Sequence, residues 1–168
     1  LNSGISMIHQ ELSPVPERSV SENLWLGRAP RKGLIIDHKK MRQDSIELFQ
    51  RLNLDVDPDE KMGNLTVAKM QMVEIAKAVS YDSKIVIMDE PTSSLTDRET
   101  EILMNVIRNL RDQGVTVVFI SHRLSELFEI SDRITVLRDG KLVDEYKIAD
   151  LPRVQLVSKM LGKELDDL

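Results

Sequence analysis

The sequence predicts an α/β fold in which a parallel β-sheet carries an α-helical insert, and three observations support this prediction. Short, mostly apolar runs of strand length occur at four places, namely 5–9, 85–88, 115–120 and 134–137. Helical patterns separate the last three runs, as expected for the crossover connections of parallel strands. Residues 11–80 show helical and loop patterns alone, which places them in a separate, mostly α-helical insert.

The insert follows the strand at 5–9. We expect three helices in it, at 19–26, 37–52 and 67–79. Gly27 ends the first of these helices, and Asp37 is a suitable N-cap for the second. A loop over 55–64 joins the second helix to the third.

The second half of the chain contains residues that typically begin and end helices and strands. Thr96 and Glu99 form a capping box that opens a long amphipathic helix, which ends at Gly114. Asp139 and Gly140 are typical of a hairpin turn after the strand at 134–137. The remaining elements are a short helix, a β-strand and a last helix, expected at 124–129, 142–146 and 153–161.

The composition limits the classes of function. The chain has 168 residues, 41% of them hydrophobic, which suits one globular domain with a sizeable core. Its net charge of −5 and the lack of a dense Lys/Arg cluster argue against binding to nucleic-acid backbones. The absence of cysteine excludes disulfides and fits a reducing cytoplasm. No apolar run approaches the roughly 20 residues of a membrane span, so we expect membrane association only through a partner.

Polar side chains follow three of the predicted strands. Gln10 comes after the first strand, Asp89 and Glu90 after the second, and Ser121 and His122 after the third. Parallel strands place their carboxyl ends at one edge of the sheet, where open α/β sheets bind ligands. We therefore expect an amide, two carboxylates and an imidazole to converge on one crevice.

This set of groups suits phosphoryl transfer from a magnesium nucleotide. Asp89 can hold Mg²⁺ through water, and Glu90 can orient or deprotonate the attacking water. His122 can bind the terminal phosphate, and Gln10 can reach the metal. Each residue also has a structural alternative, since strand-end His and Gln side chains often only satisfy local hydrogen bonds. The shared position of the four side chains at one edge of the sheet favours a functional site over these structural alternatives.

Thr66 is placed to cap the helix that begins at Val67. The free N–H groups at such a helix start and the positive end of the helix dipole form an anion site. The alternative is that Thr66 caps the helix and does nothing more.

The residues singled out so far resemble the motifs of ABC ATPases. The stretch 85–92 resembles the Walker B segment and 93–96 the D-loop, while 8–11 resembles the Q-loop and 120–122 the switch histidine. Residues 65–71 stand where the LSGGQ signature belongs. The resemblance covers residues 4–162, and it implies a P-loop NTPase-like parallel sheet with a helical signature subdomain.

Further stretches resemble the ATPases of monosaccharide importers, of the galactose/methyl-galactoside type first and the ribose type second. These stretches are 25–28, 70–77 and the Ser-Ser-Leu-Thr D-loop. Such ATPases carry two ABC domains, and this chain resembles the first because it keeps Glu90 after Asp89. The resemblance divides the chain into an ATPase core, 1–10 with 81–168, and a helical subdomain, 11–80.

The resemblance assigns a role to each candidate. Asp89 would bind Mg²⁺, Glu90 would act as general base, and His122 would contact the γ-phosphate of ATP. Gln10 would contact the metal and link the site to the membrane subunit. The helical subdomain would dock on the transmembrane permease subunit, at the cytoplasmic face of the plasma (inner) membrane.

On the signature side, the residues would touch ATP held by a second ABC domain. Thr66 and the amides of Ala68 and Lys69 are the candidates, together with Thr96 in the D-loop. Departures from the family pattern concern these positions. Val67 and Ala68 replace the two glycines of the signature, Lys69 replaces its Gln, and Thr96 replaces the D-loop Asp.

No G-x-x-x-x-G-K-[ST] phosphate-binding loop occurs in these 168 residues. The resemblance places that loop before Leu1, and we expect a piece of a longer protein that binds ATP very weakly and does not hydrolyse it alone. The family sheet also has a strand between 115–120 and 134–137 that this chain lacks. We therefore expect either direct pairing of these two strands or a non-native dimer.

Three functions remain open from the sequence. The first is an ATPase subunit that drives sugar import, active only in the longer protein. The second is a non-catalytic module that docks on the membrane subunit. The third is a non-transport ABC ATPase of nucleic-acid repair or translation, which the acidic charge balance disfavours.

Overall fold

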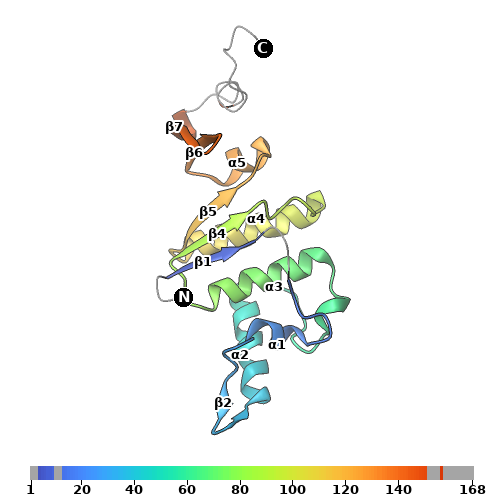
Figure 1. The fold of residues 1–168 in the computed structure, drawn as a ribbon. Helices are drawn as coiled ribbons and strands as arrows, with labels where there is room; N and C mark the ends of the chain where they lie inside the picture. The colour runs from blue at the N-terminus through green and yellow to red at the C-terminus, as the bar shows by residue number, and fades with distance from the viewer. Residues whose placement is uncertain (1–3, 10–12, 151–155, 157–168) are drawn as a thin grey trace. The chain divides into compact units, whose positions relative to one another are not determined.

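A computed structural model describes residues 4–9, 13–150 and 156 (Figure 1). The chain divides into two compact units, Leu1–His122 and Arg123–Leu168. This division differs from the core and helical subdomains expected from the sequence, 1–10 with 81–168 and 11–80, which stay a prediction.

The first unit is built on a parallel sheet of strand order β1-β4-β5, as predicted. The strands are β1 (Ile5–Ile8), β4 (Ile85–Asp89) and β5 (Thr116–Ile120). Side chains alternate between the two faces of the sheet. One face is buried and includes Ser6, Ile8, Val86 and Met88. The other face leaves large apolar side chains exposed, namely Ile5, Met7, Val118 and Ile120.

Four helices of the first unit surround a common core. They are α1 (Val20–Leu24), α2 (His38–Arg51), α3 (Val67–Val79) and α4 (Asp97–Asp112). Helix α3 packs against β1 and α1, α1 packs against α2, and α4 packs against β5. Fully buried side chains from these elements form the core, among them Leu24, Phe49, Met62, Val73, Ile75, Leu103 and Leu110.

Side-chain caps begin the helices where the sequence predicts them. Asp37 and Thr66 accept hydrogen bonds from the backbone of α2 and α3. Thr96 and Glu99 form the predicted capping box of α4. Because capping depends on residues within one helical turn, it can be predicted from local sequence.

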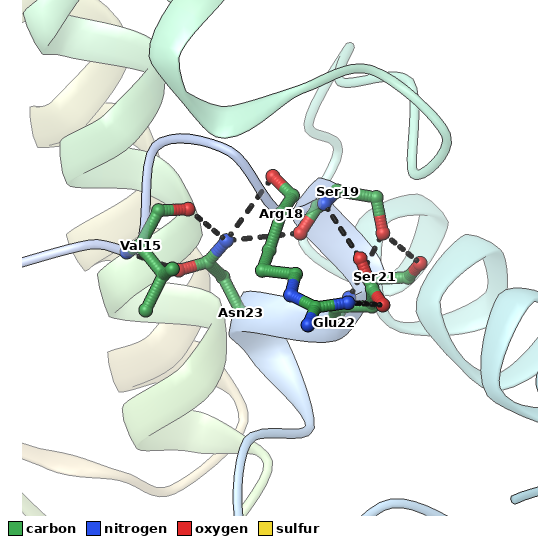
Figure 2. Close-up of polar contacts among 6 residues, drawn as sticks. All are labelled: Val15, Arg18, Ser19, Ser21, Glu22 and Asn23. Atoms are coloured by element: carbon green, nitrogen blue, oxygen red, sulfur yellow. Dashed lines mark hydrogen bonds and ion pairs between the residues drawn. The ribbon is translucent and has the colours of Figure 1, made fainter.

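A second capping box fixes the start of α1 (Figure 2). The Ser19 N–H donates to the Glu22 carboxylate over 2.9 Å, and the Glu22 N–H donates to Ser19 Oγ over 3.2 Å. The Asn23 side chain accepts from the Val15 N–H at 2.8 Å and donates to the Val15 carbonyl at 3.0 Å. These contacts hold the segment that leads into α1 against that helix.

A β-hairpin lies where the sequence analysis expects no element, between Gly27 and Asp37. Its strands are β2 (Arg31–Lys32) and β3 (Ile35–Ile36), paired antiparallel. Strands of two residues are too short for an alternating pattern to be recognised. A 3₁₀ turn at Met62–Asn64 also falls within the expected loop, and α1 ends two residues earlier than predicted.

The second unit contains α5 (Leu124–Ile130), β6 (Arg133–Arg138), β7 (Lys141–Lys147) and a 3₁₀ turn at Ile148–Asp150. Strands β6 and β7 form the predicted antiparallel hairpin, in which Asp139 and Gly140 take φ values of 51° and 73°. Except for Leu156, the helix expected at 153–161 lies outside the described residues.

The predicted direct pairing of the third and fourth strands is wrong. Among the described strands, β5 pairs with β4 alone, whereas β6 pairs with β7 in a separate sheet. The tight turn at Asp139-Gly140 brings β7 to β6 at a small cost in loop-closure entropy, so β6 takes a local partner in its own sheet. The alternative outcome, a dimer, stays a prediction.

The described helices also bear on membrane association. None of those within the described residues is long and apolar enough to cross a lipid bilayer.

Candidate functional site

The carboxyl edge of the sheet brings together two of the candidate residues. Asp89 is the last residue of β4, Glu90 follows it, and His122 lies two residues after β5. His122 Nδ1 lies 3.0 Å from Glu90 Oε1. The Glu90 N–H donates to the carbonyl of Ile120 over 2.9 Å, which ties the two strand ends together. As expected from the sequence, the ends of parallel strands bring Glu90 and His122 together.

Glu90 has an unusual backbone conformation. Its φ is +43°, in the left-handed region. The other non-glycine residues with positive φ in the described part of the chain are Asn or Asp, which tolerate this region better. For a glutamate this conformation costs about 1 kcal/mol or more, and such strain is concentrated at functional sites.

Asp89 is half-buried beside this pair. Among the described residues, no group of three or more His, Asp or Glu side chains is placed to hold a metal ion. The carboxylates of Asp89 and Glu90 offer oxygen donors, the ligand type that Mg²⁺ prefers. Gln10, the fourth candidate at this edge, lies outside the described residues.

The signature-side candidates lie at the start of α3. Thr66 Oγ1 accepts from the Lys69 N–H over 3.3 Å, and both residues are exposed. Val67 is also exposed, whereas Ala68 is buried. Of the two side chains that replace the signature glycines, only that of Val67 therefore stands at the open end of the helix. The Ala68 side chain packs inward, so only its amide is left as a candidate contact.

Thr96 is engaged in the capping box of α4. Its hydroxyl donates to Glu99 Oε2 over 2.8 Å, and its N–H donates to the same atom over 2.9 Å. A contact from this hydroxyl to a nucleotide would compete with the cap.

A pocket of about 370 Å³ connects the start of α3 with the loop after Glu90. Val67, Met70 and Gln71 line one side of it, and Glu90 and Ser93 line the other. Gln71 is 5% exposed, and its Nε2 has no hydrogen-bond partner in the described structure. The sequence analysis missed Gln71, although a glutamine among buried residues of an amphipathic helix is a recognisable signal.

The sequence matches the ABC transporter family over residues 1–93. The galactose/methyl galactoside import ATP-binding protein MglA of Clostridium perfringens is 52% identical over 167 residues, which cover 99% of this chain and 32% of that protein. The chain thus spans about a third of the length of the curated relatives it matches.

Solved structures agree with this match. An ATP-binding cassette of an ABC transporter superposes with a TM-score of 0.80 and 25% identity, covering 96% of this chain and 68% of that one. A dimeric cassette in a post-hydrolysis state bound to ADP and Pi gives a TM-score of 0.69 at 25% identity, covering 86% and 62%.

Proposed function

Because this chain belongs to the ABC transporter family, we propose that it supplies part of the ATP-hydrolysing unit of a galactose or methyl galactoside importer. The observation that carries the proposal is the Glu90–His122 pair at 3.0 Å, on the carboxyl edge of a parallel sheet directly after Asp89. The 52% identity to an import ATP-binding protein supports the choice of substrate class.

In this proposal Glu90 is the general base. Its carboxylate accepts a proton from the water that attacks the γ-phosphate of ATP. Asp89 would hold Mg²⁺, whose charge would stabilise the phosphates. The side chain of Glu90 is about one-third exposed, so water can reach the carboxylate while its backbone is fixed by Ile120.

His122 contacts the γ-phosphate through the nitrogen that does not face Glu90. Its Nδ1 donates to the Glu90 carboxylate, because a carboxylate can only accept. Nε2, on the other side of the ring, would then face a phosphate oxygen.

The start of α3 acts on a second nucleotide. Thr66 and the amides of Ala68 and Lys69 contact the γ-phosphate of ATP bound to a second ABC domain. An exposed helix start favours an anion, and the exposed Lys69 adds a positive charge there. Thr96 is a weaker candidate, because its hydroxyl is used in the helix cap.

The proposed partners follow from this arrangement. The helical region between β1 and β4, together with Gln10, docks on a transmembrane permease subunit. The protein is held at the cytoplasmic face of the plasma membrane through that subunit, and nucleic acid is not a partner.

The proposal can be tested with a chimera. The matching third of the Clostridium perfringens relative is replaced by this chain, and galactoside uptake is measured in cells that lack the relative. We expect uptake by the chimera and loss of uptake with Glu90→Gln. Assembly with the permease but no uptake from the parent chimera would refute the ATPase role. Uptake that survives Glu90→Gln would favour the second candidate, a non-catalytic docking module.

A further inference from the structure

The β2–β3 hairpin exposes the largest run of apolar side chains in the described part of the chain. Leu34 is 96% exposed, Ile35 75% and Ile36 41%. Figure 1 shows the hairpin projecting beyond α2, at the end of the first unit away from the sheet. It therefore lies apart from the carboxyl edge that carries Glu90 and His122. Consecutive exposed apolar residues on a projecting element indicate an interaction surface.

The hairpin is ordered by its own backbone. Arg31 pairs with Ile36 and Lys32 with Ile35. Gly33 begins the two-residue turn with φ +68°, and the Asp37 N–H donates to the Pro30 carbonyl over 2.8 Å at the base. These bonds satisfy much of the backbone and leave Leu34 at the tip.

The strand register decides which side chains share a face of the hairpin, and this arrangement favours one kind of partner over another. Residues directly opposite each other in an antiparallel pair share a face. One face of the ribbon therefore carries Arg31 with Ile36, and the other carries Lys32 with Ile35. Each face of the hairpin therefore combines one apolar side chain with one cationic side chain. A hairpin that docks flat on a protein needs only one apolar face, whereas one inserted by its tip is surrounded on all sides.

The positive charges near the hairpin favour an anionic surface as the environment of its tip. Residues 31–40 carry four Lys/Arg side chains and one carboxylate, in a chain whose net charge is −5. Arg31, Lys32 and Lys39 are exposed, while Lys40 pairs with Asp44. Long basic side chains can keep their charges at headgroup level while neighbouring apolar residues enter the bilayer interface.

We propose that the β2–β3 hairpin inserts Leu34 and Ile35 into the interface of an anionic lipid bilayer, with Arg31 and Lys32 bound to the headgroups. This contact adds to the proposed docking of the same region on a permease and requires no nucleotide.

The test uses the 168-residue chain and sedimentation with vesicles. Vesicles of phosphatidylethanolamine with phosphatidylglycerol are compared with vesicles of phosphatidylcholine alone. We expect binding to the anionic vesicles that is weakened by salt. Leu34→Ser with Ile35→Ser should lower the partition coefficient about tenfold or more. Arg31→Gln with Lys32→Gln should lower it roughly fivefold for each cation removed.

Leu142→Ser is the matched control. Leu142 is 64% exposed on the β6–β7 hairpin, whose tip is Asp139-Gly140, and it should leave binding unchanged. Circular dichroism confirms that all variants are folded. No binding of the parent chain to anionic vesicles, or an equal loss with Leu142→Ser, would overturn the proposal.

Insertion can be followed directly because the chain has no cysteine. A polarity-sensitive fluorophore on Leu34→Cys should shift to the blue with anionic vesicles, and one on Leu142→Cys should not. If Leu34→Cys shifts only with vesicles that contain the permease, the hairpin docks on protein and the lipid proposal is wrong. The uptake assay of the chimera is independent of these results.

Discussion

At the scale of single residues, the carboxyl edge of the sheet places a strained backbone among the candidate catalytic side chains. Glu90 takes a left-handed backbone conformation, pairs with His122 and follows Asp89. The meeting of Glu90 and His122 could be predicted from the sequence, because parallel strands end at one edge. The backbone conformation of Glu90 and the pocket contact of Gln71 could not, since both depend on how the loop after β4 packs on α3.

The strain at Glu90 predicts a gain of stability on removing its side chain. Glycine accepts positive φ without a Cβ clash, so Glu90→Gly should raise the free energy of unfolding by about 0.5–1 kcal/mol. Urea denaturation measures this change, with Glu90→Gln as the control that keeps the side chain and should stay close to the parent. A loss of stability in Glu90→Gly would show that the conformation is not strained.

Arg28 is the second residue with a special environment. Its guanidinium carbon lies 4.5 Å from the centre of the Trp25 ring and 4.0 Å from that of Tyr81. It also donates to the carbonyls of Leu24 and Ser80, so it joins the end of α1 to the end of α3. A planar guanidinium suits stacking and forked hydrogen bonding in a way that an ammonium does not.

Arg28→Lys should therefore destabilise the chain by about 1–3 kcal/mol, through lost stacking and two lost hydrogen bonds. Thermal or urea unfolding checks this value. Arg31→Lys, on the exposed hairpin, is the matched control and should have almost no effect. An equal stability of Arg28→Lys and the parent would mean that the stacked geometry contributes nothing.

At the scale of elements, helices could be predicted from local sequence, whereas the pairing of distant strands could not. The bounds of α3 match the prediction, and both Thr96 and Asp37 cap helices, because these patterns lie within a few residues. The β2–β3 hairpin was missed because its strands have two residues each. The partner of β5 was mistaken because strand pairing depends on competition between distant segments.

The two capping boxes predict a dependence of stability on pH. The Thr96 N–H lowers the pKa of Glu99 below its ordinary value of 4.5, and the Ser19 N–H lowers the pKa of Glu22 in the same way. A lowered pKa in the folded state means that folding favours the charged carboxylate. This stabilisation is fully present above a pH of about 4.5 and is lost as the pH falls below that value.

Glu22→Gln with Glu99→Gln should therefore reduce the loss of stability on acidification. Glutamine keeps the geometry of a capping box but does not titrate. Urea unfolding at neutral pH and at a pH of about 3 measures the difference. Glu101→Gln, an exposed change on α4, should leave the pH dependence as in the parent. An unchanged pH dependence in the double variant would contradict the assignment.

At the scale of the whole molecule, one face of the β1-β4-β5 sheet is apolar and exposed. Ile5, Met7, Val118 and Ile120 lie on it, and β5 has no described strand partner beyond β4. An apolar sheet face beside a free edge favours self-association. This keeps the dimer as the expected state of the isolated chain.

Sedimentation equilibrium of the 168-residue chain should show a concentration-dependent dimer. Val118→Asp with Ile120→Asp should shift the chain to a monomer, while Leu142→Asp, on the second unit, should not. A parent chain that stays monomeric at high concentration would exclude this mode of association.

We propose above that Glu90 is the general base of an ATPase site. The most direct measurement is the rate of ATP hydrolysis by the purified chimera described above, with Glu90→Gln and with the exposed control Glu101→Gln. We expect Glu90→Gln to lower kcat about a hundredfold or more while nucleotide affinity stays unchanged, and Glu101→Gln to keep the parent rate. Hydrolysis by Glu90→Gln within about twofold of the parent rate would contradict this role, because a general base typically contributes about a hundredfold or more.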